Sequence, residues 1–147
     1  MEPSRSTSFI KGHYSNYVSS LEKSLGNKIT YEKDLNLMGR KLFGNNFRGV
    51  FPKDKQPKLK RGQSIIVNLD PHTEPGSHWV AKYNSGGKDW VYDSYGRKNI
   101  LKDGKKEKSV KVTEGEKQKK SENNCGPRSL AWLMTVYKYG VGHANRI

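Results

Sequence analysis

The sequence predicts an α+β fold in which a mixed β-sheet packs against a helix that carries the only cysteine. Three observations predict it. Apolar residues recur at helical spacing near both ends of the chain, and the middle contains short β-branched and aromatic runs between turn residues. Cys125 stands where a polar, turn-forming stretch gives way to a helical pattern. We expect residues 1–147 to form a single domain, long enough to bury a real core.

The N-terminal part is expected to be helical after a polar segment through Gly12. Apolar residues recur every three or four positions over 14–25, and Gly26 follows as a stop signal. A second helix is expected over 30–43, with Thr30 as its N-cap.

The segment that follows leads into the sheet. The apolar residues of 47–51 are expected to pack a loop onto the core, and the basic segment 53–62 is expected to be an exposed connection. Residues 64–69 are β-branched and apolar, which is typical of a central strand.

Two alternating runs, 78–83 and 89–93, predict a β-hairpin around the turn-forming stretch 84–88. His78 opens the first strand and Asp93 closes the second. Antiparallel pairing brings these two positions to the same end of the sheet. We therefore expect their side chains to lie close together.

The last part of the chain contains the cysteine helix. It is preceded by a basic stretch with one expected edge strand at 109–112. Apolar residues over 130–137 mark one face of the helix, and Pro127 fits its first turn, where a backbone amide has no intrahelical partner. The residues after Gly140 are expected to fray.

The composition limits the function classes. There are 28 Lys and Arg residues against 14 Asp and Glu, a net charge of +14 that suits nucleic acid, a virion interior or another polyanion. One cysteine excludes an internal disulfide framework and is consistent with a reducing compartment. No apolar run follows Met1 as in a signal peptide, and none is long enough to cross a bilayer, so we expect no membrane partner.

A cysteine beside a helix N-terminus is suited to nucleophilic chemistry. The amides and the dipole of the first turn favour the thiolate, which is the reactive form. A lone cysteine is nevertheless more often a small buried hydrophobe. The interpretation of Cys125 therefore depends on whether the chain supplies a base.

A cysteine nucleophile needs a base and a third group that orients this base. Only His143 follows Cys125, in a short glycine-rich tail, so the base is expected to precede the nucleophile. His78 is the best candidate because Asp93 ends the neighbouring strand. Of the two other histidines before Cys125, His13 has no evident carboxylate partner and His72 lies in a turn-rich loop.

Acyl transfer also needs hydrogen-bond donors for the oxyanion that develops on the substrate. The backbone amide of Cys125 at a helix start is one candidate. A side-chain amide shortly before the cysteine is a second, and Gln118 is the only glutamine between His78 and Cys125.

These residues carry a resemblance to a known family. Gly-Ser-His-Trp at 76–79, Trp-Val-Tyr-Asp-Ser-Tyr-Gly at 90–96, and Gln118 seven positions before Cys125-Gly126 resemble the adenovirus protease (adenain) family. That family belongs to the same clan as the SUMO-specific Ulp proteases. The likeness spans roughly 35–137. Two further motifs look like those of the small proteases of virophages and Polinton-like elements: 42–44 and 47–51.

The resemblance implies a papain-like or adenain-like fold and a cysteine endopeptidase that matures capsid and other virion precursors in the infected cell and the virion. It also implies a narrow cleft that favours cleavage after a small residue such as glycine, no cofactor or metal, and stimulation by DNA in some relatives. We expect a monomer. The implied roles are general base for His78, orienting carboxylate for Asp93, nucleophile for Cys125 and oxyanion donor for Gln118, with Trp79 and Gly126 beside the substrate cleft.

Several alternatives remain at this point. A peptidase of the same clan that acts on ubiquitin-like proteins, or an acetyltransferase, would use the same His-acid-Cys arrangement. A basic protein that packages nucleic acid would account for the charge without any catalysis. A zinc site is a weaker alternative because the spacing of its ligands is loose. Its ligands would be His72, His78, Asp93 and Cys125.

Overall fold

The computed structural model describes residues 7–25, 32–69, 78–98, 100–101, 107–110, 118 and 124–146. In chain order its elements are α1 (Thr7–Leu25), α2 (Glu32–Phe43), the 3₁₀ turn η1 (Gly44–Asn46), β1 (Phe47–Pro52), the 3₁₀ turn η2 (Lys53–Lys55), β2 (Ser64–Asn68), β3 (Trp79–Asn84), β4 (Asp89–Tyr92), β5 (Glu107–Ser109), α3 (Cys125–Tyr139) and α4 (Val141–Ala144).

The five strands form one mixed sheet in the order β1-β2-β3-β4-β5. Both outer pairs, β1 with β2 and β4 with β5, are parallel, and the two inner pairs are antiparallel. The predicted α+β class with a mixed sheet and a packed helix is confirmed at this level.

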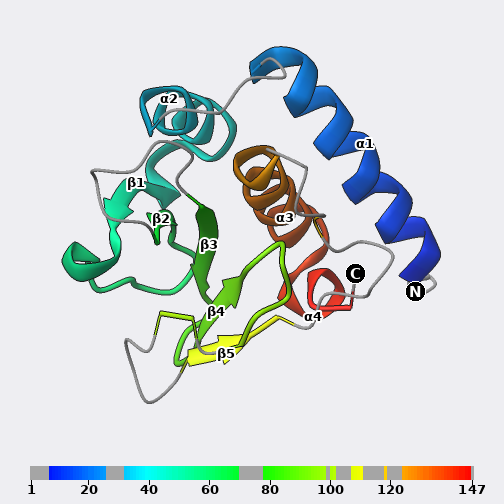
Figure 1. Cartoon of the computed structure of the whole chain (residues 1–147). Coiled ribbons are helices and arrows are strands. Elements are labelled where there is room, and N and C mark those ends of the chain that lie inside the picture. Colours follow the sequence, from blue (N-terminus) through cyan, green and yellow to red (C-terminus); the bar gives the residue numbers. More distant parts are fainter. Residues whose placement is uncertain are drawn as a thin grey trace.

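The sheet is buried on both faces because its central strands alternate between two apolar clusters. On one face, Ile66 and Ala81 pack with Leu130 and other residues of α3. On the opposite face, Ile65 and Val80 pack under loop residues. Figure 1 shows α3 between the sheet and α1, so the cysteine helix is the middle layer of the molecule.

The predicted hairpin and cysteine helix are confirmed. Strands β3 and β4 pair from Ala81–Tyr92 to Asn84–Asp89, and both glycines of the turn, Gly86 and Gly87, have positive φ. Helix α3 begins at Cys125. Pro127 lies in its first turn, where its missing amide costs no intrahelical bond.

Three predictions about the remaining elements are wrong. Residues 47–51 were expected in a loop but belong to β1, an edge strand whose pairing to β2 is interrupted by a bulge between Phe47 and Val50. Helix α1 begins at Thr7 rather than after Gly12, because Ile10 supplies one more buried position on its apolar face. The tail after Gly140 forms α4, held by a hydrogen bond from Trp132 Nε1 to the Ala144 carbonyl oxygen (3.3 Å).

Other predictions are confirmed in part or lie outside the described residues. The second helix ends at Phe43 as expected, and the exposed connection before β2 buries one residue, Leu59. The expected edge strand near 109 is observed two residues earlier as β5. The described residues do not include several positions to which a role was given: Gly26, Thr30, His72 and 111–112.

Candidate active site

The candidate site lies where the β3–β4 hairpin meets the N-terminus of α3. His78 immediately precedes β3, Asp93 immediately follows β4, and Cys125 is the first residue of α3. The hydroxyl of Ser129, one turn into α3, donates to the backbone carbonyl of Trp79 (3.1 Å). This bond fixes the start of β3 against the start of the helix, so three segments that are distant in sequence meet at one place.

The histidine and the carboxylate are in direct contact. His78 Nε2 and Asp93 Oδ1 are 2.6 Å apart, and both residues are buried. The Tyr95 amide donates to the same carboxylate oxygen (3.0 Å), and Arg97 Nε donates to Asp93 Oδ2 (2.7 Å). The carboxylate is therefore held from both oxygens, and it in turn fixes the imidazole.

A second contact orients the imidazole plane. The ring of Tyr95 stacks on the ring of His78, with centroids 4.5 Å apart and planes 22° from parallel. The guanidinium of Arg97 lies over the Tyr95 ring, 5.3 Å from its centroid. Offset stacking of this kind restricts ring rotation, so His78 has one preferred orientation.

The sulfur of Cys125 lies within hydrogen-bond reach of the same imidazole. Nε2 of His78 is hydrogen-bonded to Asp93, so the imidazole contacts both the carboxylate and the sulfur. The backbone amide of Trp79 also donates to Cys125 Sγ (3.5 Å). The sulfur therefore lies next to a backbone N–H donor at the N-terminus of a helix.

The protonation of His78 follows from these neighbours. Burial alone lowers the pKa of His78, but hydrogen bonds to Asp93 and Cys125 and the negative charge of both raise it to about 9. Burial alone raises the pKa of Asp93, but the hydrogen bonds from His78, the Tyr95 amide and Arg97 hold it below its ordinary value. At neutral pH His78 is therefore an imidazolium paired with the Asp93 carboxylate.

Gln118 lies beside this centre and is buried. Its backbone amide donates to the Ser94 carbonyl (2.8 Å), and the Ser94 hydroxyl donates to Gln118 Oε1. The side-chain oxygen therefore accepts from Ser94, and this bond fixes the orientation of the Gln118 side-chain amide. Ser94 was not singled out in the sequence, since a serine after an acidic residue in a turn carries no distinguishing signal.

The two residues expected beside a cleft are buried. The side chain of Trp79 is 5% exposed and belongs to the apolar cluster with α3, so its main contribution at the site is its backbone amide. Gly126 is the second residue of α3. Its amide, like that of Cys125, has no acceptor within the helix, as for any first-turn residue.

A polar network ties the start of α3 to α1. Arg128 Nε donates to Asn124 Oδ1 (3.1 Å), and Asn124 Nδ2 donates to Glu22 Oε1 of α1 (3.4 Å). The hydroxyls of Tyr14 in α1 and Tyr92 in β4 are hydrogen-bonded to each other. These long-range contacts left no sequence signal, because each residue has an ordinary helical or strand pattern.

Within the described part of the chain, no group of three or more His, Cys, Asp or Glu side chains is placed to hold a metal ion. Of the four residues considered for zinc, His72 lies outside the described residues. In the same part of the chain, no helix combines the length and apolar character required to span a bilayer.

The chain matches no protein-family model, and searches of curated proteins and of solved structures likewise find no match. The arrangement of His78, Asp93 and Cys125 therefore has to be interpreted from its own chemistry.

Proposed function

We propose that this protein is a cysteine endopeptidase. A single observation carries the proposal: one buried imidazole bonds the Asp93 carboxylate at 2.6 Å and the sulfur of Cys125, which begins a helix. A structural cysteine needs neither a charged partner nor a helix N-terminus. The arrangement supplies a nucleophile, an acid–base group and its orienting carboxylate.

The chemistry follows from the groups. The Cys125 thiolate attacks the scissile carbonyl carbon, and its oxygen takes the negative charge beside the first-turn amides of α3. The imidazolium of His78 gives its proton to the leaving amine as the C–N bond breaks, which leaves an acyl-enzyme. Neutral His78 then takes a proton from water, whose oxygen attacks the thioester. The C–S bond then breaks, which releases the acid product and restores the Cys125 thiolate, while His78 is again an imidazolium.

The finer assignment rests on the resemblance to adenain-like proteases. The fold would be papain-like, with the histidine and acid preceding the cysteine in sequence. Gln118 would donate to the oxyanion through its side-chain NH2, and its burial beside Ser94, next to Asp93 in the chain, supports this. The substrates would be capsid and other virion precursors cleaved after a small residue such as glycine. The excess of basic residues would permit sequence-independent contact with DNA.

The test is cleavage of a capsid precursor by the full-length protein and by Cys125→Ala, with and without DNA. We expect kcat/KM for Cys125→Ala to fall by about 10⁴-fold or more, with an unchanged thermal melting curve because little volume is lost. A glycine-aldehyde or ubiquitin-like probe should label Cys125 only if the clan chemistry is right, and the two probes distinguish precursor cleavage from action on ubiquitin-like proteins. Equal cleavage by Cys125→Ala, or no cleavage and no labelling, would reject the proposal.

A further inference from the structure

Three residues of the short segment 93–97, directly after β4, contact one another around His78. Asp93 bonds the imidazole at 2.6 Å, and the Tyr95 ring stacks on it with centroids 4.5 Å apart. Arg97 contacts both of these residues: its Nε donates to the second oxygen of Asp93 (2.7 Å), and its guanidinium lies 5.3 Å from the Tyr95 ring centroid. The two groups that hold the imidazole are therefore joined by one arginine.

A tight turn brings Arg97 back onto Asp93. The Gly96 amide donates to the Asp93 carbonyl oxygen (2.7 Å), and the backbone of Gly96 has a φ of 76°, a conformation that glycine adopts readily. The side chain of Arg97 thus returns to the carboxylate four residues earlier. The position of Arg97 is set by this turn and does not depend on a distant segment.

The ion pair of Asp93 and Arg97 extends from the interior to the surface. The side chain of Asp93 is 0% exposed and that of His78 is 9% exposed, whereas that of Arg97 is 48% exposed. Burial penalises the charged His78–Asp93 pair, because a proton that moves from the imidazolium to the carboxylate leaves two neutral groups. A guanidinium at Oδ2 favours the charged carboxylate and therefore opposes this transfer. Cys125 and Tyr95 are ionisable groups that also contact His78, and neither brings a positive charge.

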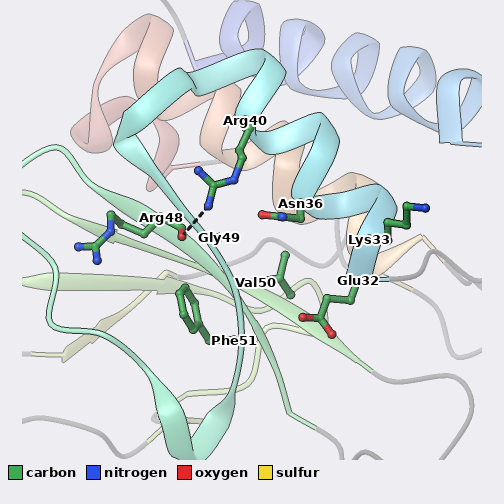
Figure 2. Close-up of a pocket in the computed structure, with 8 residues that line it drawn as sticks. All are labelled: Glu32, Lys33, Asn36, Arg40, Arg48, Gly49, Val50 and Phe51. Carbon is green, nitrogen blue, oxygen red and sulfur yellow. Dashed lines mark hydrogen bonds between the residues drawn. The ribbon is translucent and has the colours of Figure 1, made fainter.

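Two arginines elsewhere in the molecule provide a comparison. A pocket of about 520 Å³ lies between helix α2 and edge strand β1, and side chains from both elements line it (Figure 2). In this α2–β1 pocket, Arg40 donates to the Arg48 carbonyl oxygen (3.3 Å) and Arg48 donates to Gln63 Oε1 (3.4 Å). Among the described residues neither arginine is ion-paired. Arg40 is therefore an exposed arginine that bonds a neutral oxygen, outside the cysteine centre, and is a matched control for Arg97.

We propose that Arg97 is a positioning residue of the cysteine centre, which fixes the Asp93 carboxylate against His78 and keeps the proton on the imidazole. The inference rests on the proposed peptidase function, in which this proton goes to the leaving amine. Arg97 acts through Asp93 and Tyr95 rather than on the substrate. Its loss is therefore expected to slow the chemical step and to leave substrate binding largely unchanged.

The first measurement compares precursor cleavage by the full-length protein, Arg97→Ala and Arg40→Ala. We expect kcat to fall by about 10- to 100-fold in Arg97→Ala, as for the loss of a hydrogen bond to a charged group, with KM within about twofold. Arg40→Ala should leave both constants unchanged.

Chemical rescue shows whether the guanidinium itself is required. Because the Arg97 side chain is about half exposed, solutes can reach the space that Arg97→Ala opens. Added ethylguanidinium should restore most of the lost kcat, whereas tetramethylammonium, a cation without N–H donors, should not. An unchanged kcat, a loss that ethylguanidinium does not reverse, or equal recovery with the two cations would overturn the proposal.

The second measurement does not depend on turnover. NMR spectra of the ¹⁵N-labelled histidine rings report the His78 N–H that bonds Asp93, and His78→Gln identifies its signal. We expect Arg97→Ala to shift this signal, ethylguanidinium to reverse the shift, and Arg40→Ala to leave the signal in place. An unchanged signal in Arg97→Ala would overturn the positioning role. If the wild type cleaves no precursor and Cys125 is not labelled, the peptidase proposal fails, and this spectrum still decides the role of Arg97.

Discussion

The cysteine centre and the α2–β1 pocket differ in how their polar groups are satisfied. At the cysteine centre, both oxygens of the Asp93 carboxylate, the His78 ring and the Cys125 sulfur have partners inside the protein. In the pocket, Asn36 Oδ1 has none in the described structure.

This difference indicates that the cysteine centre is preorganised. Groups that hold each other in place before any ligand arrives are suited to bond making and breaking, where misplacement is costly. The comparison can be tested by perturbing one region at a time, and the largest effect is expected at the cysteine centre.

Asp93→Asn should damage the cysteine centre alone. An amide at this position no longer holds the His78 tautomer or supports its positive charge, so we expect kcat/KM to fall by about 10³–10⁴-fold. The matched control is Asp89→Asn, which removes a carboxylate from the other end of β4, where it contacts Lys82 and Asn84. Peptidase kinetics should show less than about a threefold change in the control. A similar loss of rate in both variants would mean that the hairpin, not the His78–Asp93 pair, matters.

The pH dependence of kcat/KM should show a smaller effect, and its direction follows from the pKa of His78. The pKa of His78 is about 9, so the imidazolium that protonates the leaving amine is lost above that pH. We expect the alkaline limb of the kcat/KM profile near pH 9, falling about tenfold per pH unit beyond it. Asp93→Asn should move this limb to lower pH, whereas Arg40→Gln should leave it in place. An alkaline limb that stays at the same pH in Asp93→Asn would contradict its assignment to His78.

The pH dependence of the folding stability should reflect the same two groups, His78 and Asp93. The pKa of His78 is raised above its ordinary 6.5, so the stabilisation is complete below that pH and is lost as the pH rises through about 9. The pKa of Asp93 is lowered below its ordinary 3.8, so its contribution is complete above that pH and is lost as the pH falls further. Thermal melts of the wild type and of Asp93→Asn should therefore converge at the acid extreme, whereas a difference should remain at alkaline pH, where the Tyr95 amide and Arg97 still bond the carboxylate.

Gly39→Ala should perturb the pocket region with the smallest effect on catalysis. A Cβ at this position in α2 would lie 2.4–2.7 Å from ring atoms of Phe47 in β1, so either this ring or the helix must shift. We expect a loss of about 1–3 kcal/mol in the free energy of unfolding.

The control for this change is Gly12→Ala in α1, where the added methyl group meets nothing within 4 Å. It should stabilise the protein by up to about 1 kcal/mol through helix propensity. Chemical unfolding measures both, and the rate of Cys125 alkylation should change in neither. An altered alkylation rate in Gly39→Ala would show that the two regions are coupled.

The parts of the fold that were predicted are those with local signals. The β3–β4 hairpin has alternating strands around a Gly-Gly turn, and α3 has a polar start and an apolar stripe. The proximity of His78 and Asp93 followed from antiparallel pairing alone.

The parts that were missed depend on contacts between distant segments. Strand β1 contains Gly49 at a bulge and ends at Pro52, which hides its alternation, and it pairs in parallel with β2 across a long connection. Helix α4 is held by Trp132, 12 residues before Ala144. The pocket between α2 and β1 could not be foreseen, because an asparagine and arginines at helical or strand positions are ordinary in sequence, and only the packing of the two elements brings them together.

The first residue of α3 is also the only thiol in the chain, with 8% of its surface exposed. A fluorine-bearing or fluorescent tag attached there would carry no background from other positions, so no cysteine-free variant has to be engineered first. Because each molecule carries one tag, the amount of label measures the number of reactive Cys125 residues. The signal of the tag also reports when the start of α3 separates from the end of the hairpin and from α1 during unfolding.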